Sequence, residues 1–198
     1  MQRILLHSFG VVLTLLIALS PAGENIAEGQ ESLNAQLRGD FAYTIFRGCI
    51  NAFDGLDEQL RLLGFGAPNT FVARGIVRFN RDGTGTADRF LLAIVSVPSP
   101  GAIPVTEGES TCDLTHTANP DGSITQAWQC AGIVTVGNRA GQNFTVDGIE
   151  FQSRISKGGR VLLLSDTDAR VETITFQGGT PLQRICNRSG IAIKIRQP

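Results

Sequence analysis

The chain has 198 residues, 18% of them charged, and a formal net charge of −1 at pH 7. A balance this close to neutral excludes the strong electrostatic attraction that binds nucleic acid or an anionic membrane. The length suits one domain with a buried core once an N-terminal segment is set aside.

That segment, residues 1–22, has the three parts of a secretory signal peptide. Arg3 supplies a positive start, residues 4–19 are largely apolar, and Ser20-Pro21-Ala22 resembles a cleavage site. A retained membrane anchor is the alternative, but spanning a bilayer takes about 20 apolar residues and this run is shorter. We expect cleavage after Ala22 and a secreted or periplasmic protein with no membrane contact afterwards.

Residues 23–37 are polar and aperiodic, which predicts a flexible lead-in to a single domain over residues 38–198. One short helix is expected over residues 54–63, because Asp54 can cap its start and Gly64 can end it. β-Strands are expected over residues 40–47, 71–79, 89–97, 111–118, 123–136, 144–155, 160–164, 170–176 and 182–195. About eight or nine strands at short intervals predict an all-β, antiparallel up-and-down barrel, with a β-sandwich as the alternative.

Glycine-containing turns separate these runs. Residues 80–83 and 119–122 share the pattern Asn-X-Asp-Gly, which suits a type I turn followed by a glycine with positive φ in a three-residue hairpin loop. Around Asp147-Gly148 the apolar residues change from even to odd positions, which predicts a bulge or a tight turn.

Four cysteines, Cys49, Cys112, Cys130 and Cys186, fall in the exported part. An even number in an oxidising compartment predicts two disulfides, and the spacings do not suit zinc. Counting outward from the turn at 119–122, Cys112 faces Cys130 at a non-hydrogen-bonded site, where side chains are closest. Cys49 then pairs with Cys186 and ties the two ends of the meander. If the protein is cytoplasmic instead, all four stay reduced.

The signal peptide, the meander of strands, the recurring Asp-Gly-Thr/Ser turn and the segment Cys186-Asn187-Arg188 resemble small exported bacterial proteins of unassigned function. In size and strand number these are similar to calycin-like or allene-oxide-cyclase-like barrels. The Gly-X-Trp mark of lipocalins is absent, since the only tryptophan is Trp128. The resemblance implies a barrel over most of residues 38–195 and carries over no catalytic or binding residue.

Side chains suited to catalysis are few. His7 leaves with the signal, so His116 is the only histidine of the exported part, and no Gly-X-Ser-X-Gly elbow accompanies it. One histidine also excludes a histidine-based metal site. Asp166-Thr167-Asp168 could place two carboxylates near a hard cation, although a polar turn is the commoner explanation. We expect no catalytic residue, metal or cofactor; an enzyme would most readily use Tyr43, Glu150 or His116.

Ten of the 11 phenylalanines remain once Phe9 leaves with the signal. They could pack as a core or line an apolar cavity, and the sequence leaves both open. The leading hypothesis is therefore a non-catalytic barrel that binds a small apolar ligand. A structural or protein-interaction role in the periplasm or outside the cell is the alternative. A cofactor-free enzyme with an apolar pocket is a second alternative.

Overall fold

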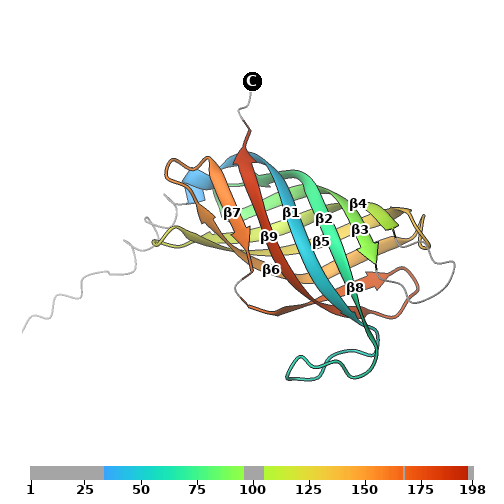
Figure 1. Ribbon diagram of the computed structural model, residues 1–198. Helices are drawn as coiled ribbons and strands as arrows, with labels where there is room; N and C mark the ends of the chain where they lie inside the picture. Colours follow the sequence, from blue (N-terminus) through green and yellow to red (C-terminus); the bar gives the residue numbers. More distant parts are fainter. Residues whose placement is uncertain (1–33, 96–104, 167, 196–198) are drawn as a thin grey trace, which may run out of the picture.

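The computed structural model describes residues 34–95, 105–166 and 168–195 (Figure 1). Within them nine strands form one antiparallel sheet, and pairing of β1 with β9 closes it into a barrel. The strands are β1 (Gly39–Ala52), β2 (Gly66–Phe79), β3 (Thr84–Val95), β4 (Val105–Ala118), β5 (Ser123–Val136), β6 (Asn143–Ile155), β7 (Val161–Ser165), β8 (Arg170–Phe176) and β9 (Leu182–Lys194). The predicted antiparallel barrel is thus confirmed, and the β-sandwich alternative is wrong.

β7 and β8 share one position in the wall. Both pair antiparallel with β6 on one side and β9 on the other, β7 with residues 152–155 and 189–193, and β8 with residues 144–147 and 182–186. The two strands therefore follow one another end to end and are separated by residues 166–169. This leaves eight positions around the barrel, a width that side chains fill or that holds one small ligand.

The turn chemistry sets the register of the hairpins. Gly83 and Gly122 have φ of 86° and 79°, as the Asn-X-Asp-Gly pattern predicts. Asn119 donates its backbone N–H to the Ser123 carbonyl at 2.8 Å, and the register then runs to Cys112 opposite Cys130. The predicted bulge is confirmed at Gly148, where φ is 74° and the β5–β6 register shifts.

The half of the barrel around the start of β1 has a packed apolar interior. Phe41 and Phe79 meet edge to face with ring centroids 5.6 Å apart, and Trp128 lies 5.8 Å from the ring of Tyr43. Residues 34–37, the end of the predicted flexible lead-in, instead form one turn of helix. It closes this end with Leu37, which is fully buried.

The helix predicted over residues 54–63 is wrong. This segment is an irregular loop that extends the β1–β2 hairpin and projects from the opposite end of the barrel (Figure 1). The Asp57 carboxylate accepts the backbone N–H groups of Gln59 and Arg61, both at 2.9 Å, and Asp54 accepts that of Phe65. Such local side-chain bonds offer the backbone an alternative to helix.

Two disulfides join facing strands, Cys112–Cys130 between β4 and β5 and Cys49–Cys186 between β1 and β9. Disulfides are typical of an oxidising, non-cytoplasmic compartment. The predicted signal peptide and most of the lead-in lie outside the described residues. No helix in the described part of the chain is long and apolar enough to cross a membrane.

Candidate functional site

In the part of the chain that the structure describes, four arginines point into the half of the barrel nearer the β1–β2 loop. They are Arg47 on β1, Arg89 on β3 and Arg184 and Arg188 on β9, and each is at most 3% exposed. Successive side chains of a strand point to opposite faces, so Arg184 and Arg188 face inward together with Cys186, which lies between them. Buried charges need partners, because removing them from water is costly.

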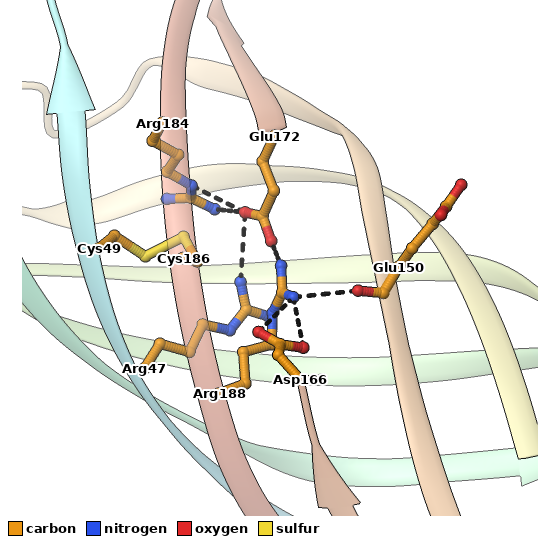
Figure 2. Close-up of a disulfide and its surroundings, with 8 residues drawn as sticks. All are labelled: Arg47, Cys49, Glu150, Asp166, Glu172, Arg184, Cys186 and Arg188. Carbon is orange, nitrogen blue, oxygen red and sulfur yellow. Dashed lines mark hydrogen bonds and ion pairs between the residues drawn. A yellow bond between two sulfur atoms is a disulfide. The ribbon is translucent and has the colours of Figure 1, made fainter. Parts of the chain in front are cut away.

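Glu172 of β8 is the main partner. It is fully buried, and its carboxylate accepts from Arg184 Nε at 2.8 Å and lies 3.6 Å from Arg47 Nη1 (Figure 2). Its other oxygen is in close ionic contact with Arg188. One carboxylate thus joins three guanidinium groups from the two strands that close the barrel.

The interruption between β7 and β8 supplies the second carboxylate. Asp166 follows β7 directly, and both of its oxygens lie 3.0 Å from Arg188 Nη1. The same nitrogen donates to the Glu150 backbone carbonyl at 3.2 Å. Burial raises the pKa of Asp166, opposed by the charge of Arg188, while burial and then the charge of Arg47 lower the pKa of Arg188 to about 10.

Arg89 has no such partner. Its Nε donates to Ser110 Oγ at 2.9 Å, but Nη1 and Nη2 make no hydrogen bond within the described part of the chain. Burial, followed by the charge of Arg47, holds the pKa of Arg89 well below its usual range. Arg89 is therefore a buried cation with two terminal nitrogens that could bind an anion.

Arg89 is one of the residues that line an interior cavity of about 70 Å³. Arg47 and Arg184 line it too, and most of the remaining wall is apolar. The larger apolar side chains of this wall include Phe71, Leu91, Phe144, Ile174 and Phe176. One water needs about 10–15 Å³ by this kind of measure, so the cavity has room for several waters or a small organic group.

A larger hollow of about 1420 Å³ lies on the outside of the wall. Exposed side chains of both charges line it, among them Arg74, Asp88 and Glu109, and the buried residues Arg89 and Ser110 border it as well. Arg74 already lies over the ring of Phe90, 5.1 Å from its centroid. The mixed charges of this hollow indicate no single class of ligand, whereas the lining of the interior cavity does.

The three polar residues singled out from the sequence do not come together. Tyr43 is inside the barrel, where its hydroxyl donates to the Asp88 carbonyl at 3.4 Å and burial raises its pKa to about 12. His116 is buried against Phe79 near the closed end. Glu150 is on the outer face, 3.5 Å from Arg170.

The hypothesis of a cation at Asp166-Thr167-Asp168 gains no support, because Asp166 is engaged by Arg188. Within the described residues no group of three or more His, Cys, Asp or Glu side chains could hold a metal ion. The sequence reasoning missed the arginines, although a signal existed. Arg184 and Arg188 each lie two residues from Cys186, and Arg47 lies two residues from Cys49. Because side chains alternate along a strand, a buried disulfide between the two cysteines places all three arginines on the inner face.

No protein-family model matches the chain, and a search of curated proteins finds no match. Among solved structures, Neisserial surface protein A resembles it with a TM-score of 0.51 and 9% identity, over 79% of this chain and 97% of that one. The S-type phycobiliprotein lyase CPES from Guillardia theta aligns with a TM-score of 0.26 and 8% identity, over 87% of this chain and 97% of that one. The first match shows a likeness in barrel fold.

Proposed function

We propose that this protein is an exported, non-catalytic barrel that binds a small molecule in its interior cavity. The observation that carries the proposal is the Arg89 guanidinium, whose two terminal nitrogens are buried beside a cavity without a partner in the described residues. A pocket with apolar walls and a few fixed polar groups is the usual form of a small-molecule site. The sequence alone pointed to an apolar ligand, and the arginines add a polar requirement.

Binding is favoured over catalysis by the placement of the reactive groups. Tyr43, Glu150 and His116 occupy separate places within the described residues, and the tyrosine hydroxyl is already bonded to a carbonyl. General acid–base or nucleophilic catalysis needs such groups within hydrogen-bond reach of each other or of a substrate. Three of the interior arginines are fixed in ion pairs, and the terminal nitrogens of Arg89 are the fixed polar groups that remain for a ligand.

One side of the outer wall, formed by β4, β5 and β6, suits an aqueous compartment. The outward side chains of β4, β5 and β6 are mostly hydroxyls, amides and charged groups, such as Thr115, Gln129 and Gln152. The other side exposes apolar side chains of β1, β2, β7 and β9, which are Phe46, Ile50, Ile76, Leu163, Ile191 and Ile193. A barrel embedded in hydrocarbon presents an apolar band around its whole circumference, which the polar side formed by β4, β5 and β6 interrupts. Together with the signal peptide predicted from the sequence and the two disulfides, this supports export to the periplasm or the cell exterior.

Native mass spectrometry of the mature protein, purified from its exported fraction, tests the proposal. We expect an added mass of a small molecule that is lost on denaturation. A matching thermal-shift screen of small acids, alcohols and esters should raise the melting temperature for at least one class. An apo mass combined with no shift from any class would overturn the proposal.

A second function, docking to a protein partner, is favoured by the β1–β2 loop. Phe53, Leu62, Leu63 and Phe65 in this loop are 52%, 43%, 63% and 55% exposed. Gathered exposed apolar side chains often mark interaction sites. A photo-crosslinker at position 63 should capture a partner in intact cells, whereas one at the exposed Thr115 should not; equal labelling would count against docking.

A further inference from the structure

We propose that the ligand is an organic acid, whose carboxylate lies against the terminal nitrogens of Arg89 and whose apolar part lies among the side chains of the cavity. This inference rests on the proposed function and names the class of molecule that the cavity takes. It follows from three properties of the site: its charge, the fixed orientation of Arg89 and the composition of the walls.

The buried charges do not balance. Among the described residues four buried guanidinium groups face two buried carboxylates, and these carboxylates are already engaged, Glu172 with Arg47, Arg184 and Arg188, and Asp166 with Arg188. Among the described residues Arg89 has the Ser110 hydroxyl as its one side-chain hydrogen-bond partner. An anion beside Arg89 would reduce this excess of positive charge in a place where water screens little.

The orientation of Arg89 suits a carboxylate. Ser110 holds the Nε edge of the guanidinium at 2.9 Å, so the plane of the group is fixed and the two terminal nitrogens remain for a ligand. Two parallel N–H donors of an arginine match the two oxygens of a carboxylate. Because the donor is held before binding, little conformational freedom is lost when the acid binds.

The walls favour an organic acid over an inorganic anion. Phe71, Leu91, Val134 and Phe144 line the cavity, and a hydrated inorganic ion would lose its water against them without gaining contacts. Glu107, which is partly exposed, also lines the cavity, so the carboxylate of a bound acid has to lie on the side of Arg89. The volume of about 70 Å³ suits a carboxylate with a short apolar chain.

The shifted pKa of Arg89 agrees with this arrangement. Burial and the neighbouring positive charges of Arg47, Arg184 and Arg188 lower it. A bound carboxylate acts in the opposite direction, because an opposite charge favours the ionised form of the guanidinium. Acid and protein therefore stabilise each other's charged forms.

A pair of matched probes tests the inference, hexanoate and 1-hexanol, measured by isothermal titration calorimetry on the intact mature protein. We expect hexanoate to bind at least about tenfold more tightly than 1-hexanol, the effect of hydrogen bonds to a charged group. Arg89→Gln should remove this preference. Arg74→Gln, which changes an exposed arginine on the outer wall, should leave it unchanged.

Ser110→Ala provides a second variant if Arg89→Gln does not fold. It removes the hydrogen bond to Arg89 Nε, so it should weaken the binding of hexanoate several-fold and leave the binding of 1-hexanol unchanged. Equal binding of the two probes, unaffected by either variant, would overturn the proposal that the ligand is an acid. It would not contradict the proposal of a ligand site inside the barrel. Binding of chloride or inorganic phosphate in preference to hexanoate would also overturn the organic acid. If neither probe nor any inorganic anion binds, the inference fails together with the proposed function.

Discussion

Cys49 and Cys186 face each other across β1 and β9, the pair of strands that closes the barrel, with Cα atoms 4.1 Å apart. Arg47, Arg184 and Arg188 lie two residues away from these cysteines along the same strands and also point inward (Figure 2). The bond that closes the seam therefore also fixes the spacing of three of the four buried arginines.

The first prediction concerns the two disulfides. Non-reducing peptide mapping should give Cys49–Cys186 and Cys112–Cys130 peptides, and a Cys49–Cys112 peptide would contradict it. The bonds close segments with separations of 137 and 18 residues. On the chain-entropy model, replacing Cys49 and Cys186 by alanine should lower the free energy of unfolding by about 5 kcal/mol, and replacing Cys112 and Cys130 by about 3 kcal/mol. Denaturant unfolding of the two double variants measures the difference.

The second prediction tests the buried ion cluster. Glu172→Gln leaves three arginines without their common carboxylate, so we expect a loss of about 3–5 kcal/mol in the free energy of unfolding. Glu150→Gln is the matched control, because that carboxylate is 48% exposed and pairs with Arg170 on the surface. It should cost at most about 1 kcal/mol. Equal losses in urea unfolding would show that the buried cluster contributes no more than a surface pair.

The third prediction concerns pH. Burial lowers the pKa of His116 from its ordinary value of 6.5, opposed by the nearby charge of Asp82. The unfolded chain then binds more protons than the folded one just below pH 6.5, so stability should fall as the pH is lowered from about 7 to 5.5. His116→Phe keeps an aromatic ring beside Phe79 and should flatten this part of the profile. An unchanged slope in denaturant titrations would contradict the assignment to His116.

The fourth prediction concerns the β1–β2 loop. Asp57 holds its turn through the backbone N–H groups of Gln59 and Arg61 and through Arg61 Nε at 2.7 Å. Asp57→Ala should speed trypsin cleavage after Arg61 without changing the melting temperature of the barrel. Glu58→Ala removes a neighbouring carboxylate that takes no part in these hydrogen bonds, so trypsin should cleave this variant at the original rate. Should Asp57→Ala lower the melting temperature instead, the loop would be part of the cooperative unit.

Much of the fold was accessible from the sequence because strand alternation and turn chemistry are local. Asn119 and Gly122 determine the turn, and period two then places Cys112 opposite Cys130. The prediction of a helix over residues 54–63 was wrong because capping residues alone do not reveal the hydrogen bonds by which Asp54 and Asp57 hold the backbone in turns.

The site was harder to predict because it depends on contacts between distant strands. Parity places Arg184 and Arg188 inside, but the carboxylates that meet them come from Glu172 and from Asp166, at the interruption of a strand. The sequence predicts that interruption as a polar turn, but it does not show that Asp166 would meet an arginine of β9. The free terminal nitrogens of Arg89 are likewise visible only once all its neighbours are in place.

The last prediction concerns the glycine that lets β2 and β3 approach beside the site. Gly75 lies opposite Arg89 in the register, and a Cβ built on it would lie 1.9 Å from the Asp88 carbonyl oxygen. That atom belongs to the backbone, so the strand itself would have to move. Gly75→Ala should therefore lower the free energy of unfolding by about 1–3 kcal/mol, the usual cost of overpacking.

Gly48→Ala is the control for this substitution, because a Cβ on Gly48 meets nothing within 4 Å. It should change the free energy of unfolding by no more than about 0.5 kcal/mol, as surface substitutions do. Because Gly75→Ala displaces β3 at Arg89, it should also weaken hexanoate more than 1-hexanol, whereas Gly48→Ala should affect neither. Destabilisation without any change in hexanoate binding would show that the position of Arg89 does not depend on this close approach.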